Sequence, residues 1–313
     1  MEKYISKKVE VELGNFYHCD HIYNESVDIY DADTGDIIFL LRKNIIPAGY
    51  YELHEGLIKH SQATSSNRGN ASGKVTIQGL VRGKESWKAF PSKLCDRKGN
   101  PLTKEASSSY FIYNDGRLSK RARSNTVSSS AIGGFDKSPQ HPCRLTHWTK
   151  HHLKQYESIF PLCKYVSDRY FEYFPDKWLH QYETYLNSPK DFVIPDSNFS
   201  TITLNNTFRT AAHQDKGDCK KGLTCFTVKK IGNYSGGELH FPDYDVGVNV
   251  EEGDLLIFNP HITHCNNAIK GQGRVSFVFY LREKMDRCPQ EDSKKLVSTL
   301  SLSHASARAS LLR

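Results

Sequence analysis

The sequence of 313 residues has no apolar run long enough to cross a lipid bilayer. The apolar runs IIFLL (37–41) and LLIF (255–258) have the length of β-strands. The first residues, MEKYISKKVEVEL, lack the apolar stretch of a secretory signal. We therefore expect an intracellular protein without a membrane segment.

The eight cysteines include no Cys-x-x-Cys pair. That spacing is typical of structural zinc sites, whereas dense disulfide frameworks are typical of secreted domains. The cysteines are scattered over the chain, at positions 19, 95, 143, 163, 219, 225, 265 and 288. We expect reduced and mostly buried thiols.

Composition excludes a fibrous or disordered chain, because 38% of the residues are hydrophobic and 25% are charged.

The formal net charge is +7. A basic balance of this size favours a polyanionic partner without identifying one.

The chain divides into three regions by pattern. Residues 1–140 are predicted to be rich in β-strand, with strands at 7–13 and 37–41 and flexible loops, rich in Ser and Gly and partly basic, at 61–73 and 116–136. Residues 141–287 form the predicted core, and 288–313 a basic, poorly ordered tail.

Within the core region, helices precede strands. Apolar residues at 145–187 recur at helical spacing, and Pro161 and Pro175 divide this stretch into two or three helices. Short strands then follow at 199–208, 223–231, 237–241, 246–250, 254–258 and 274–281. Short, evenly spaced strands predict a sandwich or barrel, so the fold class is α+β and mainly β.

One segment predicts a metal site. FRTAAHQDKGD (208–218) places His213 two residues before Asp215, and residues two apart in extended backbone point to the same side. A pair of this kind is usually only a surface pair. An iron facial triad needs a second histidine, which PHITHCNN (260–267) supplies as His261 or His264.

Arg274 lies ten residues after His264, at the start of a predicted strand. An arginine offers a planar, two-pronged donor for the far carboxylate of a 2-oxo-acid co-substrate. We favour His264 over His261 because the loop after it returns directly to Arg274. Arg209, four residues before His213, and Asn205 are further candidates for the co-substrate pocket.

The segments YSGGELHFPDY and VEEGDLLIFNPHITHCNNAIKGQGRVSFVFYLREK resemble the catalytic end of the 2-oxoglutarate/Fe(II)-dependent dioxygenases. Within that superfamily they are most similar to the TET/JBP group, which oxidises the 5-methyl group of DNA bases. The resemblance covers about 145–285, and IIFLLRKNIIP and SNRGNASG are similar to segments of JBP-like members. It implies a double-stranded β-helix (jelly-roll or cupin-like) core with buttressing helices and a β-rich N-terminal half.

The resemblance also implies roles for individual residues. His213, Asp215 and His264 match the iron ligands, and Arg274 matches the co-substrate arginine. Tyr280 matches an aromatic residue that stacks on the flipped base, and Asp218 a polar residue at the base edge. Arg282 stands where many TET members have histidine, so the set of base contacts differs. Turn capping by Asp218 and core packing of Tyr280 are the structural alternatives.

The expected reaction is hydroxylation of the 5-methyl group of a DNA base, with Fe(II), 2-oxoglutarate and O2, ascorbate as a helpful reductant, and succinate and CO2 as co-products. A carboxylate accepts from the cytosine amino group, so Asp218 favours 5-methylcytosine over thymine. The basic loop after Gly116 offers phosphate contacts, although a solvated loop explains it equally well. Its residues are Arg117, Lys120, Arg121 and Arg123.

Two other functions fit the same residues. The first is hydroxylation of a protein side chain, such as proline, or of a small molecule by an enzyme of the same superfamily. The second is a nucleic-acid-binding module that has kept the fold and lost turnover. A DNA substrate favours the nucleus.

Overall fold

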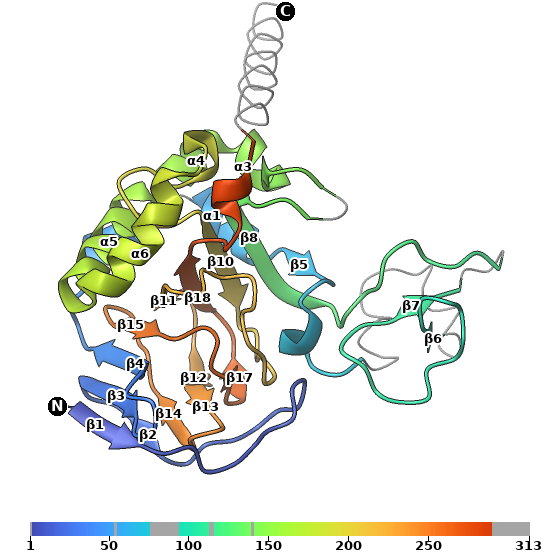
Figure 1. Cartoon of the computed structure of the whole chain (residues 1–313), viewed down its shortest axis with the longest axis horizontal. Helices are drawn as coiled ribbons and strands as arrows, with labels where there is room; N and C mark the ends of the chain where they lie inside the picture. The colour runs from blue at the N-terminus through green and yellow to red at the C-terminus, as the bar shows by residue number, and fades with distance from the viewer. Residues whose placement is uncertain (1, 53–54, 76–93, 113–115, 139–140, 290–313) are drawn as a thin grey trace, which may run out of the picture.

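The computed structural model describes residues 2–52, 55–75, 94–112, 116–138 and 141–289. Two β-sheets form the centre of the molecule, and helices lie along one flank of the larger sheet (Figure 1). The mainly-β prediction is confirmed. The sheet strands come from both the N-terminal region and the region after residue 190, so residues far apart in sequence share one sheet.

The larger sheet has ten strands in the order β1-β3-β4-β15-β11-β18-β10-β8-β5, with β9 paired to β8. Its strands are β1 (Glu2–Ile5), β3 (Val27–Asp31), β4 (Ile37–Arg42), β5 (Thr64–Ser65), β8 (Val127–Phe135), β9 (Arg144–Leu145), β10 (Thr201–Asn206), β11 (Thr224–Lys230), β15 (Leu255–Phe258) and β18 (Arg274–Tyr280). All but one of the pairings are antiparallel, the exception being β1 with β3.

The smaller sheet has the order β16-β13-β14-β2. Its strands are β2 (Ile22–Tyr23), β13 (Leu239–Phe241), β14 (Val246–Val248) and β16 (Cys265–Asn266). Alternate side chains of both sheets, such as Leu256 and Phe258 on β15 and Leu239 and Phe241 on β13, form one core between the sheets. The two facing sheets are the sandwich that the short strands predicted.

The opposite face of the larger sheet is covered by helices. Leu255 and Ile257 of β15 point to that side, where Leu162, Val166 and Tyr170 pack on them in a second core. The helices are α3 (His147–His151), α4 (Leu153–Glu157), α5 (Phe160–Tyr173) and α6 (Pro175–Leu186). Pro161 and Pro175 lie in the first turns of α5 and α6, where the missing N–H has no intrahelical partner. The two prolines lie at helix starts as predicted, but the stretch contains four helices and not two or three, because it also breaks at His152 and before Phe160.

The remaining elements are short. They are the helices α1 (Glu55–Ser61), η1 (Ala48–Tyr51), η2 (Gly69–Ser72), η4 (Lys190–Phe192) and η5 (Met285–Arg287), and the strand pairs β6 (Leu94–Cys95) with β7 (Tyr110–Phe111) and β12 (Tyr234–Gly236) with β17 (Ile269–Gly271). The predicted strand at 7–13 is wrong, because Lys8 and Val9 instead donate their N–H groups to the carbonyl of Asp243 in an irregular segment.

The Ser- and Gly-rich segment predicted as a loop contains β8, a nine-residue strand. β8 pairs with β10 over its central residues, so its backbone groups are satisfied in spite of its composition. A Cβ added at Gly134 would lie 1.9 Å from the carbonyl oxygen of Phe192, and one at Gly133 2.3 Å from that of Ser200. The glycines therefore permit close packing of the backbones. From composition alone they suggested a flexible loop instead.

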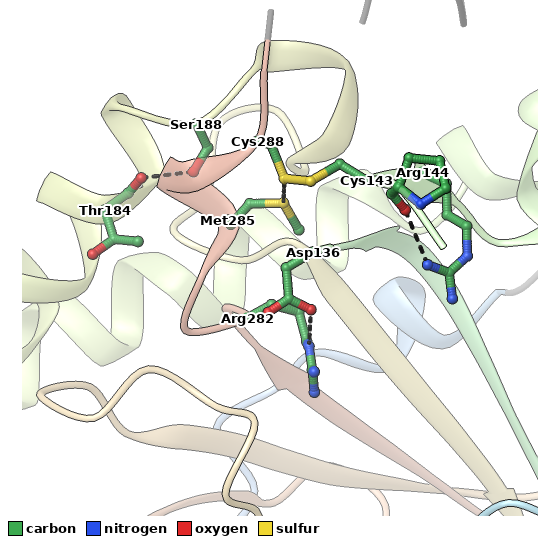
Figure 2. Close-up of a disulfide and its surroundings, with 9 residues drawn as sticks. Asp136, Cys143, Arg144, Thr184, Ser188, Arg282, Met285 and Cys288 are labelled. Carbon is green, nitrogen blue, oxygen red and sulfur yellow. Dashed lines mark hydrogen bonds and ion pairs between the residues drawn. A yellow bond between two sulfur atoms is a disulfide. The ribbon is translucent and has the colours of Figure 1, made fainter. Parts of the chain in front are cut away.

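Two cysteines are not reduced. Cys143 and Cys288 form a disulfide with Cα atoms 5.7 Å apart, so the expectation of reduced thiols is wrong for this pair (Figure 2). The other six are free and buried, as expected. The two partners are 145 positions apart and only the fold brings them together. The bond joins the segment before β9 to the segment after β18.

Within the described residues, no helix has the length and apolar character needed to span a membrane.

Candidate metal centre and substrate cavity

His213, Asp215 and His264 converge at one point between the two sheets. Their ligand atoms all lie within 4.8 Å of one another. The Asp215 carboxylate is 3.8 Å from Nε2 of His213 and 3.4 Å from Nε2 of His264. Paired backbone hydrogen bonds of 3.0 Å between His213 and His264 fix the two segments side by side. Two imidazoles and one carboxylate with room on the far side are the donor set of a non-haem iron site.

Hydrogen bonds orient both histidines. Nδ1 of His213 lies 2.8 Å from the carbonyl oxygen of Ala211, and Nδ1 of His264 lies 2.9 Å from that of Ile262. A proton on each Nδ1 leaves both Nε2 atoms as free lone pairs facing Asp215. His261, the competing candidate, is instead directed to the carbonyl oxygen of Cys219 at 3.3 Å.

The protonation states also suit a cation. Burial, with the neighbouring His264, lowers the pKa of His213 to about 4, so its imidazole is neutral at pH 7. Burial raises the pKa of Asp215, but the hydrogen bond from His264 and the electrostatic interactions with His213 and Arg68 outweigh it and keep that pKa below its usual range. The cluster thus presents a neutral imidazole at His213 and a carboxylate at Asp215.

A cavity of about 690 Å³ opens next to this cluster. Cavities of about 300–1,000 Å³ hold small ligands in proteins. Phe226, Leu239 and Phe258 give it an apolar side, and Thr203 and Ser276 add hydroxyl groups. His213, Asp215 and His264 all line this cavity.

Arg274 begins β18 and is 4% exposed. Its guanidinium lies 5.7 Å from the ring centre of Phe226, which lines the cavity, although Arg274 itself does not. Burial lowers the pKa of Arg274, and nearby Tyr234 and Glu238 oppose that effect. No carboxylate of a described residue lies within ion-pairing distance of it, so the cation has capacity for an external anion.

Arg68 is a site residue that the sequence reasoning missed. It lines the cavity, and its Nε is buried without a hydrogen-bond partner among the described residues. Burial lowers the pKa of Arg68, while Tyr280 and Asp215 raise it, which places the guanidinium close to the metal ligands. Arg68 could have been found from its segment, SNRGNASG, which is similar to a segment of JBP-like members.

Asp218 and Arg282 lie next to each other at the cavity wall, joined by a backbone bridge. Nε of Arg282 donates to Asp136 at 3.1 Å (Figure 2). A Cβ at Gly217 would lie 2.2 Å from Nη1 of Arg282, so this glycine makes room for the guanidinium. Oδ2 of Asp218 accepts from Thr224 at 3.1 Å. Asp136, also missed by the sequence reasoning, holds Arg282 in place.

Tyr280 and Asn205 both line the cavity. The Tyr280 hydroxyl lies 3.1 Å from that of Thr203, and burial raises the pKa of Tyr280 to about 12. Oδ1 of Asn205 accepts from Ser129 at 2.5 Å. The structure therefore places both predicted residues at the site.

Arg209 does not line the cavity. Its guanidinium lies 4.7 Å from the ring centre of Phe16, with long contacts to the carbonyl oxygens of Tyr17 and Asn266. The Arg209 guanidinium thus lies over Phe16 and not at the cavity wall, which gives no support to a contact with the co-substrate. Arg209 follows a positive-φ turn at Thr207, so the strand alternation on which the expected contact depended ends before it.

The basic loop is partly held by the protein. The backbone of Arg123 pairs with Ser109, and its Nη1 donates to Ser66 at 2.9 Å. Burial lowers the pKa of Arg144, and nearby Arg121 adds to that effect. The charge of Arg144 lowers the pKa of His141, with a smaller contribution from Arg121. Arg144 lines the cavity. Arg117, Lys120, Arg121 and Arg123 do not line it, so any phosphate contact that they make lies beyond the pocket.

Residues 131–283 match the Tet_JBP family model, described as the oxygenase domain of the 2OGFeDO superfamily. This range contains all three residues of the metal cluster. Over this range the chain is similar to that oxygenase family. The matched range begins inside β8 and ends just after Arg282.

The curated proteins that the chain matches include thymine dioxygenases. The chain is 36% identical over 168 residues to thymine dioxygenase JBP1 of Trypanosoma brucei brucei, covering 49% of this chain and 19% of that protein. It is 34% identical over 154 residues to JBP1 of Crithidia fasciculata, covering 45% and 18%. The chain thus spans about a fifth of the length of these relatives.

Among solved structures, NgTET1 in complex with 5mC DNA resembles the chain with a TM-score of 0.51 and 13% identity, over 96% of this chain and 90% of that one. At this identity the likeness concerns the fold alone. It identifies the two facing sheets as the double-stranded β-helix of the TET fold, as the resemblance implied.

Proposed function

We propose that the chain is an Fe(II)- and 2-oxoglutarate-dependent dioxygenase that hydroxylates the 5-methyl group of a pyrimidine in DNA, with thymine as the preferred base. The convergence of His213, Asp215 and His264 beside a cavity of about 690 Å³ carries this proposal. The match to the Tet_JBP family and the thymine dioxygenases among the matched proteins support it.

The residues present fit the cofactors that the 2OGFeDO superfamily implies. Two neutral imidazoles and a carboxylate would hold Fe(II) and leave positions open toward the cavity. Bound Fe(II), with 2-oxoglutarate and O2, supplies the oxidising chemistry, and succinate and CO2 leave as co-products. The Nδ1 contacts to Ala211 and Ile262 keep both imidazoles in the tautomer that binds metal.

Two buried guanidinium groups suit a dicarboxylate. Arg274 has no carboxylate partner within the described chain and would bind the far carboxylate of 2-oxoglutarate. Arg68, with an unpaired Nε near Asp215, would bind the carboxylate next to the metal. Asn205 at the cavity wall would add a polar contact. Ascorbate would serve only to keep the iron reduced.

A base in a duplex cannot reach this cavity, so it must be flipped out of the stack. Tyr280 lines the cavity beside Arg68 and would stack on the flipped ring, a contact worth about 1–3 kcal/mol. The apolar side formed by Phe226 and Phe258 would exclude water from the methyl group.

Arg282 supports thymine over 5-methylcytosine. It is a permanent donor, and neither Nη atom has a hydrogen-bond acceptor among the described residues. In the proposed pose Arg282 donates to thymine O4, and Asp218 accepts from N3–H. 5-Methylcytosine would place an amino donor against Arg282, which cannot accept a hydrogen bond. Asp218 considered alone favoured 5-methylcytosine, and Arg282 reverses that preference.

DNA is the proposed partner, and the nucleus is the compartment that a DNA substrate favours. Arg144 at the cavity and Arg121 close to it would contact phosphates beside the flipped nucleotide. Arg117, Lys120 and Arg123 would extend this contact. Binding that depends on such contacts weakens steeply as salt rises.

Uracil-containing DNA tests the proposal, because it lacks only the methyl group. With Fe(II) and 2-oxoglutarate, duplex DNA with thymine should stimulate succinate release, and the same sequence with uracil in place of thymine should not. Equal stimulation by both duplexes, or by neither, would contradict methyl hydroxylation of thymine.

Replacing Arg282 should change the choice of base. Arg282→Gln can both donate and accept, so the ratio of kcat/KM for thymine to that for 5-methylcytosine should fall about 5- to 150-fold, equivalent to 1–3 kcal/mol. Competition between the two duplexes measures this ratio independently of any general loss of activity. An unchanged ratio would exclude Arg282 from base selection.

A further inference from the structure

A second group of metal-ligating side chains lies away from the iron site. Cys19, His240 and Asp245 offer donor atoms that all lie within 4.8 Å of one another. Cys19 belongs to the segment before β2, His240 to β13, and Asp245 to the turn between β13 and β14. The group therefore lies at the smaller sheet, where the N-terminal segment joins it.

His240 lacks a hydrogen-bond partner that its burial requires. It is 2% exposed, and its Nε2 is buried with no partner among the described residues. Nδ1 faces Cys265, with 3.8 Å between it and Sγ. Leu239 and Phe241 point into the core between the sheets, so His240 points to the opposite face. An unsatisfied buried nitrogen is unfavourable, and a bound cation would remove that cost.

Cys19 is held in place over that face. It is 1% exposed, its N–H donates to Oδ1 of Asn267 at 3.1 Å, and its Sγ lies 3.2 Å from the carbonyl oxygen of His21. A Cβ added at Gly247 would lie 3.4 Å from this sulfur, so the neighbouring strand is in contact with it. Burial raises the pKa of Cys19 to about 11, so without a cation it stays a thiol.

Asp245 supplies the third donor from the solvent side. Its φ of 55° is in the left-handed region, as the tight turn between β13 and β14 requires. Lys8 lies 3.3 Å from its Oδ2, and both side chains are more than half exposed. The turn thus holds a carboxylate at the open edge of the group, where a cation can enter.

We propose that Cys19, His240 and Asp245 bind a zinc-class divalent cation. A borderline-soft metal takes one sulfur, one nitrogen and one oxygen, and water fills the fourth position. Ligand atoms around tetrahedral zinc are about 3.3–3.7 Å apart, so small side-chain rotations close the group. Binding releases the Cys19 proton to solvent, and thiolate and carboxylate then neutralise the 2+ charge.

The cation would fix the N-terminal segment to the smaller sheet. His240 pairs with Cys265, which directly follows the iron ligand candidate His264. The site shares no donor with the iron cluster, so it does not depend on the proposed catalytic function. Its role is structural: it cross-links residue 19 to a hairpin more than 200 positions later.

Cobalt tests this site selectively. In the full chain carrying His213→Ala, which removes an iron ligand, one equivalent of Co2+ should produce the near-ultraviolet thiolate-to-cobalt absorption, and Zn2+ should abolish it. The iron cluster contains no sulfur and cannot give this band. Cys19→Ser should lose the band, and the matched variant Cys265→Ser should keep it.

A second variant tests the site without replacing a buried residue, so that loss of binding cannot be caused by misfolding. Asp245→Asn alters only an exposed side chain and should weaken Zn2+ binding at least about tenfold. Circular dichroism confirms that each variant is folded. Absence of the band in the folded parent, its persistence in Cys19→Ser, or unchanged Zn2+ affinity in Asp245→Asn would each overturn the proposal.

Discussion

His213→Ala should lose iron and turnover together. The variant keeps only one imidazole and one carboxylate as iron ligands. Its affinity for Fe(II) should therefore fall by more than about 100-fold, and product formation should fall to background. Iron per chain after gel filtration, and succinate release with DNA, measure the two effects.

His261→Ala is the matched control for this experiment. His261 lies in the same loop as His264 but faces the carbonyl oxygen of Cys219 instead of the cluster. It should retain iron and turnover. Equal loss of iron in His261→Ala, or full turnover in His213→Ala, would show that the metal centre is assigned to the wrong histidines.

Arg274→Ala should raise the KM for 2-oxoglutarate by at least about 30-fold. Truncating one partner of a buried, hydrogen-bonded charge pair costs about 2–5 kcal/mol, and Arg274 is the buried cation that lacks a carboxylate in the described chain. Steady-state succinate release at varied 2-oxoglutarate gives KM. Arg274→Lys keeps the charge without the two-pronged donor. Its KM for 2-oxoglutarate should therefore lie between those of the unmodified protein and Arg274→Ala.

Arg209→Ala separates this effect from a general loss of charge. Arg209 also precedes the metal cluster in sequence, but it lies over Phe16 and does not line the cavity. Its KM for 2-oxoglutarate should be unchanged. A similar rise in both variants, or no rise in a folded Arg274→Ala, would exclude Arg274 as the carboxylate anchor.

Local sequence signals predicted the parts of the fold that local physics determines. Short apolar-rich segments marked β15 and β18, and the prolines at 161 and 175 marked helix starts because their missing N–H is tolerated there. The pair His213 and Asp215 was visible because residues two apart share a face. His264 was favoured over His261 by its distance to Arg274, and the structure brings it to the cluster.

Features that depend on distant contacts were not predictable in this way. β8 is a strand because β10 lies beside it and its glycines fit against Phe192 and Ser200, none of which its Ser- and Gly-rich composition reveals. Conversely, KKVEVEL alternates like a strand but finds no partner strand. Pairing, not alternation alone, decides whether such segments enter a sheet.

Site residues that only the fold brings together were not predictable from the sequence either. Arg68 lines the cavity and Asp136 holds Arg282 at its wall, and no spacing rule connects either residue to His213 or Arg282. The disulfide of Cys143 joins residues 145 positions apart for the same reason. Cys19, His240 and Asp245 escape a search for closely spaced zinc ligands because the fold, not the sequence, gathers them.

The most direct test of the proposed activity is mass spectrometry of nucleosides from duplex DNA that contains both thymine and 5-methylcytosine, after incubation with the protein, Fe(II), ascorbate, 2-oxoglutarate and 18O2. We expect 5-hydroxymethyluracil carrying one labelled oxygen, in excess over 5-hydroxymethylcytosine, and neither product with His213→Ala. An absence of both products from protein that has bound iron and 2-oxoglutarate would contradict the assignment of a DNA base as the substrate.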